Sequence, residues 1–348
     1  MNPGRGVAPA LAGALLASWQ RPQPDALARL LQPVSWLYGA LAAGRRALYA
    51  SGLRASHKAP RPLIVVGNLV AGGAGKTPTV IALAAMLRRL GCTPGVVSRG
   101  HGRDERGTRL VDAASDANQV GDEPLLIHLR ARVPVAVAAR RIDAARALCD
   151  AHPEVNLLIA DDGLQHLALA RDAQVIVFDE RGVGNGLLLP AGPLREPLPQ
   201  VIPERTLVVY NAPRPSTPWP GHVAQRALAG VVPLADWWRG AAGDTAGWQA
   251  LQGRRVVACA GTAVPQRFFA MLTALGLDIE PLPLPDHTDY RPLPWRVDAA
   301  DVVVTEKDAV KLRPDRMGAT RVWVAPLDFH LDDAIGDTLT RWLPTTPR

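Results

Sequence analysis

The chain has 348 residues, of which 48% are hydrophobic and 20% are charged. This composition excludes a disordered chain, and the sequence has no run of 18 uninterrupted apolar residues that would indicate a multi-span membrane protein. At about 150 residues per domain, the length allows two domains or lobes with real cores. Three widely spaced cysteines, Cys92, Cys149 and Cys259, argue against a disulfide framework or a zinc ribbon and for a reducing compartment.

The net charge of +7 is concentrated at the N-terminus. Residues 1–61 carry eight Lys or Arg and one acidic residue, whereas the rest of the chain is neutral overall. A basic groove along a nucleic-acid duplex is therefore not expected, and we predict no nucleic-acid partner.

The same segment has an amphipathic pattern. Leucines recur at helical spacing over residues 27–48, beside Trp36 and Tyr38, and Pro33 is expected to divide the stretch into two helices or to begin the second. The apolar face, interfacial aromatics and basic flank favour a helix on an anionic membrane surface, although such a helix could also dock on the core. The apolar run 7–19 is too short to span a bilayer, and a secretory signal is its alternative.

From residue 62, short apolar runs alternate with helical patterns. Strands are predicted at 63–67, 94–98, 133–138, 155–160, 174–179 and 206–210, and helices at 77–90 and 140–150. Unbroken apolar strands separated by helices predict an α/β fold, with a mostly parallel sheet flanked by helices as in P-loop NTPases.

A second, smaller α/β lobe is expected after a linker. Residues 212–221 contain four prolines and are typical of such a linker. Beyond it, we predict strands near 255–260, 301–305 and 321–325 and helices near 265–275 and 331–342. The predicted domains are the basic helical segment 1–61, a P-loop core lobe 62–215 and a C-terminal lobe 216–348.

The strongest chemical signal is LIVVGNLVAGGAGKT at residues 63–77, a strand, a glycine-rich turn and a helix start. Glycines let backbone N–H groups close around phosphate oxygens, and the helix N-terminus adds partial positive charge. Lys76 can reach the β- and γ-phosphates, and the Thr77 hydroxyl can ligate Mg²⁺. The strict pattern G-x-x-x-x-G-K-[ST] has glycine where this chain has Val70. The alternative reading is a glycine turn that caps an ordinary helix.

Two carboxylates, Asp161 and Asp162, end the apolar strand pattern that begins at residue 155. A Walker-B acid holds the Mg²⁺ shell from such a strand end, so both residues are metal-site candidates. Alternatively, they cap the following structure.

Asp122 and His287 are candidates for proton transfer. Asp122 opens a helix after Gly121 and could be no more than its N-cap. His287 lies among acids in residues 285–290, which suits a carboxylate–imidazole base, although a lone histidine is often structural. None of the eight histidines stands in metal-ligand spacing with another, so a zinc site is not supported. Three further loops are polar or glycine-rich where the rim of a site would lie, namely 98–103, 184–196 and 305–311.

Taken together, these motifs resemble those of the tetraacyldisaccharide 4'-kinases, the lipid A 4'-kinases of Gram-negative bacteria. The motifs that carry the resemblance are LLQPVSWLYG (30–39), VVGNLVAGGAGKTP (65–78), VVSRGHG (96–102), VGDEP (120–124), ADDGLQH (160–166), GNGLLLPAGPLRE (184–196), RFF (267–269), PDHTDY (285–290) and TEKDAVKL (305–312). The resemblance implies transfer of the γ-phosphoryl group of ATP to the 4'-hydroxyl of a tetraacylated glucosamine disaccharide 1-phosphate. The product would be lipid IVA, made at the cytoplasmic face of the inner membrane.

The resemblance also implies roles for particular residues. Asp122 corresponds to the proposed base, assisted by His287, with Lys76 at the transferred phosphate. Asp161 and Asp162, with Thr77, correspond to the Mg²⁺ ligands. The implied ATP-binding residues are Gly72, Gly73, Ala74, Gly75, Lys76 and Thr77. Two departures stand out: His101 replaces a common tyrosine, and the run AGTAVPQRFF replaces an AGIGxPxRFF-like run.

The implied partners are the acylated disaccharide lipid and the anionic inner-membrane surface, with no obligate protein partner. Two alternatives remain. A partition- or maturation-type ATPase would carry an additional lysine where this chain has Ala71, and would give no role to Asp122 and His287. A nucleotide-gated membrane-surface scaffold would bind ATP without turnover.

Overall fold

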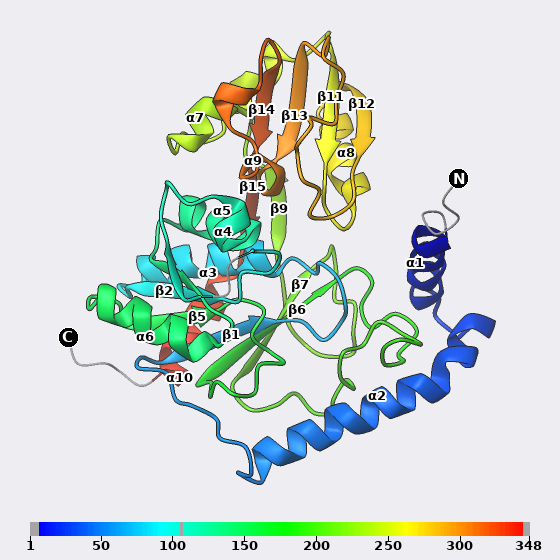
Figure 1. Ribbon diagram of the computed structural model, residues 1–348, viewed down its shortest axis with the longest axis vertical. Coiled ribbons are helices and arrows are strands. Elements are labelled where there is room, and N and C mark those ends of the chain that lie inside the picture. Colours follow the sequence, from blue (N-terminus) through cyan, green and yellow to red (C-terminus); the bar gives the residue numbers. More distant parts are fainter. Residues whose placement is uncertain (1–6, 105–106, 344–348) are drawn as a thin grey trace. The chain divides into compact units, whose positions relative to one another are not determined.

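The computed structural model describes residues 7–104 and 107–343. The chain forms two compact units (Figure 1). Among the described residues, the first unit consists of 7–76, 162–224 and 332–343, and the second of 77–161 and 225–331. The predicted boundaries after residues 61 and 215 remain a prediction.

The first unit contains a parallel sheet whose strands are buried apolar runs. Its elements are α1 (Val7–Trp19), α2 (Ala26–Ala50), β1 (Leu63–Gly67), β6 (Ala173–Asp179), β7 (Thr206–Asn211), β8 (His222–Val223) and α10 (Asp333–Trp342). The strands lie in the order β1-β6-β7-β8, and each pair is parallel. Every residue of β1 and β7 is buried, as expected for a sheet covered on both faces.

The helix α2 is continuous, so the prediction that Pro33 divides it or begins a second helix is wrong. Its start is capped by Asp25, which accepts a hydrogen bond from the backbone N–H of Ala28. A proline removes one helical hydrogen bond, but the helix is held further along, where the Ser35 hydroxyl donates to the carbonyl oxygen of Leu188 at 2.8 Å. Tertiary contacts therefore outweigh the local cost of the proline.

The first half of the second unit consists of four mostly parallel strands with helices packed against them. Its elements are α3 (Lys76–Arg89), β2 (Pro94–Ser98), β3 (Arg109–Val111), α4 (Ala117–Val120), α5 (Asp122–Ala131), β4 (Val135–Val137), α6 (Arg141–Ala151) and β5 (Leu157–Ala160). The strands lie in the order β3-β4-β2-β5, and only the edge strand β3 is antiparallel to its neighbour. The helix α6 packs on β2 and β4, and α5 packs on β4.

The rest of the second unit is built on a five-stranded sheet. Its elements are β9 (Gln225–Leu228), β10 (Val232–Pro233), α7 (Leu234–Trp238), β11 (Arg255–Ala260), α8 (Pro265–Ala274), β12 (Asp278–Pro283), β13 (Asp301–Thr305), α9 (Glu306–Ala309), β14 (Arg321–Ala325), β15 (Leu327–His330) and the 3₁₀ turns Thr245–Ala250 and Pro314–Arg316. The sheet order is β10-β14-β13-β11-β12, and β9 pairs with β15 in a separate antiparallel ribbon. Its apolar core includes Leu251, Val256, Phe268 and Leu272.

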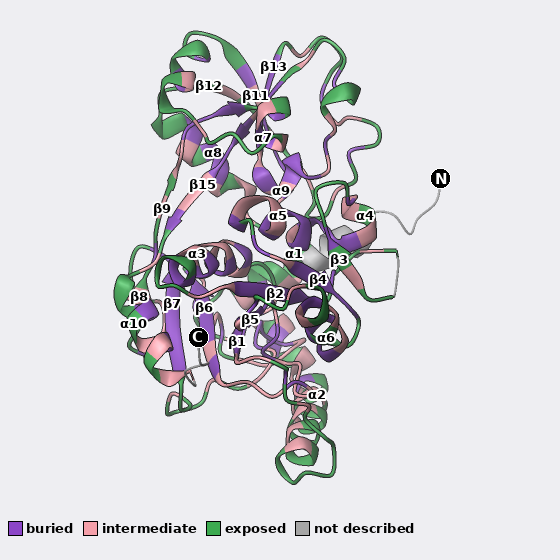
Figure 2. Cartoon of the chain, turned by 90° about the vertical axis from the view of Figure 1, so that its left-hand side faces the viewer, coloured by how far each residue is buried: buried purple, intermediate pink, exposed green. Residues whose placement is uncertain are grey.

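The strand predictions are confirmed to within two residues at each end, and those for 63–67, 94–98, 255–260, 301–305 and 321–325 coincide with the observed strands. The edge strand β12 was missed because its exposed prolines and acids break the apolar pattern. Figure 2 shows the contrast between the buried strands and the mostly exposed helix α2. Among the described residues, every helix is too short or too polar to cross a membrane.

Candidate active site

In the first unit, the loop after β1 is held in a fixed shape by side chains that bind its carbonyl oxygens. The Asn68 side-chain amide donates to the carbonyls of Val70 (2.7 Å) and Gly72 (3.1 Å). Further along the loop, Arg181 donates to the carbonyl of Gly73 at 3.0 Å. Asn211, at the end of β7, donates to the carbonyl of Ala74 at 3.2 Å. This loop is therefore a preformed turn that leads into α3, the arrangement in which backbone N–H groups bind phosphate.

Two glycines are required by the shape of the loop. Gly72 and Gly75 have φ angles of +92° and +95°, which side chains rarely permit. A Cβ atom at Gly75 would also lie 2.3 Å from the side-chain nitrogen of Asn211. The glycine at 75 thus allows both the turn and the close approach of β7.

Lys76 lies at the end of this loop, in contact with an acid from a distant segment. Its Nζ donates to Oδ1 of Asn68 at 3.3 Å and lies 3.6 Å from Oδ1 of Asp162. Asp162 has a φ of +46°, an uncommon value for a residue other than glycine. The predicted lysine and the second predicted acid are therefore brought together, 86 residues apart in the chain.

A chain of polar contacts leads away from Asp162. Nη1 of Arg195 lies 3.2 Å from Oδ1 of Asp162 and 3.2 Å from Oε1 of Gln165. The Gln165 amide then donates to Glu196 at 2.9 Å, and Glu196 lies 3.9 Å from Nη1 of Arg46 on α2. Charged and polar side chains thus connect the phosphate-type loop with the N-terminal helix.

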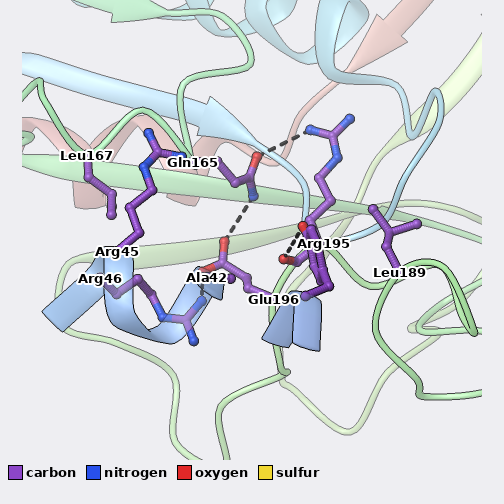
Figure 3. A pocket seen from close by; sticks show the side chains of 9 residues that line it. Ala42, Arg45, Arg46, Gln165, Leu167, Leu189, Arg195 and Glu196 are labelled. Atoms are coloured by element: carbon purple, nitrogen blue, oxygen red, sulfur yellow. Dashed lines mark hydrogen bonds and ion pairs between the residues drawn. The ribbon is translucent and has the colours of Figure 1, made fainter. Parts of the chain in front are cut away.

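The far end of this chain opens into a pocket of about 320 Å³ (Figure 3). The pocket is lined by Tyr38, Ala42, Arg45, Arg46, Gln165, Leu167, Leu189, Arg195 and Glu196. Its wall is fixed because the Tyr38 hydroxyl donates to the carbonyl of Arg195 at 2.9 Å. Three arginines beside an apolar lining suit a ligand with both an anionic group and a nonpolar part.

In the second unit, Asp161 is buried directly after β5. The Ser98 hydroxyl, from the end of β2, donates to its Oδ2 at 3.3 Å, and the guanidinium of Arg141 donates to its carbonyl at 3.3 Å. The first of the paired acids therefore faces the loop at residues 98–103, one of the three predicted rim loops.

The second unit also joins Asp122 to His287, although 165 residues separate them in the chain. Nδ1 of His287 lies 3.0 Å from Oδ2 of Asp122, and the Glu123 amide donates to Oδ1 at 3.1 Å. The Asp122 side chain is only 7% exposed, against 41% for His287. The predicted carboxylate–imidazole pair is thus formed.

Two lysines from the loop 305–311 surround this pair. Lys311 Nζ lies 3.6 Å from Oδ2 of Asp122. Lys307 Nζ lies 2.8 Å from Oδ1 of Asp286 and 3.4 Å from Oε1 of Glu123. Burial disfavours the charged form of Lys307, but the surrounding carboxylates of Glu123, Asp122 and Asp286 outweigh it and raise the pKa of the ammonium.

The predicted metal ligands fit magnesium in their chemistry. Asp161, Asp162 and Thr77 offer oxygen atoms, and Thr77 is the second residue of α3. Within residues 7–104 and 107–343, no three His, Cys, Asp or Glu side chains gather as a metal cage. Mg²⁺ in phosphate-transferring sites is held by one or two carboxylates together with substrate phosphates, so a dedicated cage is not required.

Several contacts were not foreseen from the sequence. The bracing amides Asn68 and Asn211 were missed, and their only signal was a polar residue at the end of an apolar strand pattern. Lys307 and Lys311 lay in a loop that was singled out, but nothing in the local sequence pointed to Asp122 as a neighbour.

A glycine-rich phosphate-type loop between a parallel strand and a helix, with a lysine and an acid in contact, defines a P-loop phosphotransferase of the α/β class. A model of the tetraacyldisaccharide-1-P 4'-kinase family matches residues 27–344, and the chain belongs to this family. It is therefore an enzyme, a kinase, and the predicted family and fold class are confirmed.

Individual relatives carry the name of the same family. The tetraacyldisaccharide 4'-kinase of Methylibium petroleiphilum is 54% identical over 340 residues, which cover 96% of this chain and 94% of the relative. The tetraacyldisaccharide 4'-kinase of Leptothrix cholodnii is 52% identical over 343 residues, which cover 97% of this chain and 98% of that relative. The crystal structure of LpxK from Aquifex aeolicus in complex with ATP is similar with a TM-score of 0.75 and 27% identity, over 91% of this chain and all of that one.

Proposed function

We propose that the protein transfers the γ-phosphoryl group of ATP to the 4'-hydroxyl of a tetraacylated disaccharide 1-phosphate, a step of lipid A biosynthesis. The observation that carries this proposal is the braced loop from Asn68 to Lys76, in a chain of the tetraacyldisaccharide-1-P 4'-kinase family. Phosphoryl transfer needs positioning and charge neutralisation more than covalent chemistry by the protein.

The triphosphate would be bound by the loop. The backbone of residues 72–75 would surround the phosphate oxygens, and Lys76 would neutralise the β- and γ-phosphates. The contact of Lys76 with Asp162 keeps its ammonium at the loop before nucleotide binds. Thr77, Asp161 and Asp162 would hold Mg²⁺, which when bound neutralises phosphate charge and orients the γ-phosphate.

Asp122 would be the general base. Its carboxylate would accept the proton of the sugar hydroxyl as the oxygen attacks phosphorus and the bond to the leaving ADP oxygen breaks. The 3.0 Å contact with Nδ1 of His287 would orient the carboxylate.

The pocket between α2 and the loop 184–196 would receive the anionic end of the lipid. Arg45, Arg46 and Arg195 are suited to a phosphate, and the nonpolar lining to the start of an acyl chain. The side chains of Leu30, Val34, Leu37 and Leu41 form an exposed stripe along α2, at spacings of four, three and four residues. With the eight basic residues of the N-terminal segment, this stripe would contact an anionic inner-membrane surface from the cytoplasmic side.

The base assignment is tested by Asp122→Asn, with transfer measured from γ-labelled ATP to the purified acylated disaccharide. Because a positioned base contributes roughly 10²–10⁴-fold, kcat should fall by that factor while ATP affinity stays close to that of the wild type. The matched control is Asp298→Asn, which removes an exposed carboxylate of the same unit and should leave kcat unchanged. Unaltered turnover in Asp122→Asn would remove the residue from this role.

The same assay separates the proposed kinase from a membrane-surface ATPase. The labelled phosphate should appear in the lipid fraction in amounts that match ADP release. If the label appears only as inorganic phosphate in water, the proposed acceptor is wrong.

A further inference from the structure

The segment 305–311 connects the two parts of the second unit that carry the Asp122–His287 pair. It follows β13 and contains the short helix α9, which packs against α5 (Figure 1). Lys307 binds Glu123 and Asp286, the residues next to Asp122 and His287 in the chain. One ammonium group therefore ties the start of α5 to the loop of His287.

The start of the segment 305–311 is held in place by hydrogen bonds. Asp308 is fully buried and accepts hydrogen bonds from the Thr305 hydroxyl at 2.6 Å and the Gly261 amide at 3.1 Å. This anchoring at the end of β13 fixes the backbone from which Lys311 extends.

Lys311 is directed at the carboxylate itself. Its side chain is 11% exposed, and Nζ lies 3.6 Å from Oδ2 of Asp122. The same Nζ lies 5.7 Å from the ring centre of Tyr290 and makes no hydrogen bond within the described residues. Besides Asp122, the buried carboxylate of Asp308 acts on this ammonium, as its electrostatic coupling to Lys311 indicates. Only Asp122 lies within ion-pair distance of Nζ among the described acids.

We propose that Lys311 is a positioning residue for phosphoryl transfer, which holds the buried Asp122 carboxylate beside His287 through a nearby positive charge. The proposal rests on the proposed role of Asp122 as the base. A buried carboxylate that loses its countercharge is strongly disfavoured, and without Lys311 the Asp122 side chain turns away from His287 or draws solvent into the site. Lys307 ties the backbone segment of Glu123 to that of Asp286, and Lys311 holds the Asp122 side chain.

The test is a double-mutant cycle of Lys311→Met and Asp122→Asn, with kcat and the KM for ATP measured for each protein. Methionine keeps most of the volume of lysine and removes its charge. We expect Lys311→Met to lower kcat about tenfold to a hundredfold, less than loss of the base itself, with the KM for ATP unchanged. In the Asp122→Asn background the same substitution should change kcat less than about twofold, because no carboxylate remains to be held.

Two further variants complete the design. Lys311→Arg retains the charge and should keep more of the wild-type kcat than Lys311→Met. Arg296→Met removes an exposed charge of the same unit and should leave kcat unchanged. If Lys311→Met unfolds because Asp122 is left without a countercharge, the double variant should fold again. Recovery of its melting temperature then reports the same coupling.

A wild-type kcat in Lys311→Met, or losses that multiply in the double variant, would overturn the proposal while leaving Asp122 as the base. Full turnover in Asp122→Asn would overturn both the role of Lys311 and the role of Asp122 as the base. The two experiments therefore distinguish failure of the first proposal from failure of the second.

Discussion

Arg46 is one of the residues of the N-terminal helix α2 that line the pocket of the first unit. Its guanidinium lies 3.9 Å from Glu196, at the end of the polar chain that begins at Lys76. If the pocket binds the phosphate of the lipid, Arg46→Gln should raise the KM for the acylated disaccharide about tenfold, since a hydrogen bond to a charged group is lost. The KM for ATP should not change. Both values come from steady-state kinetics in mixed micelles.

The control is Arg29→Gln, which removes an exposed charge from the same helix outside the pocket lining. Equal effects of the two substitutions would mean that Arg46 acts only through general attraction to the lipid surface. That outcome would contradict the pocket assignment.

At the residue scale, the sequence predicted the types of group but not all of their neighbours. Lys76 was predicted from local sequence, and its contact with Asp162 agrees with the expected site. The roles of Asp122, His287 and the metal-ligand candidates remain predictions. Asn211 could not be foreseen, because its contact with the carbonyl of Ala74 joins residues 137 positions apart in the chain.

At the scale of elements, we propose that the two faces of α2 have different tasks. One face is bound to the loop 184–196, through Ser35 and Tyr38, and the other presents the apolar stripe. Deleting the whole segment would remove both functions together, because the bonds that support the pocket would be lost. Substitutions in the stripe separate them.

We therefore expect the double substitution Leu37→Ser and Leu41→Ser to weaken binding to anionic vesicles about a hundredfold or more, since each of the two leucines contributes about 1.5–3 kcal/mol when buried. Turnover of a short-chain, micellar acceptor should be nearly unchanged. Vesicle flotation measures the binding. Replacing the exposed Ala40 and Ala43 of the same helix by serine is the control and should have little effect. Undiminished flotation of the leucine variant would contradict membrane contact through this stripe.

At the scale of the whole molecule, we expect the proposed metal to act in phosphate transfer and not in folding. The described residues bring together no cage of three or more acidic, histidine or cysteine side chains, whereas the sheets have extensive apolar cores. Chelation of Mg²⁺ should stop phosphate transfer and leave the melting temperature of the nucleotide-free protein unchanged. Adding Mg²⁺ with ATP should raise that temperature, because a ligand that binds only the folded state stabilises it. A lower melting temperature after chelation alone would indicate a structural metal.

The sequence by itself determined the α/β class, most strand positions, the phosphate-type loop and the uneven charge of the N-terminus. These features follow from local patterns: buried parallel strands are continuous apolar runs, and a phosphate loop needs glycines and a lysine at fixed spacing. Only the tertiary structure decided that α2 continues through Pro33, that Asp122 meets His287, and that Lys311 approaches the same carboxylate. These contacts join residues far apart in the chain, or depend on packing against distant segments, and local periodicity carries no information about such pairs.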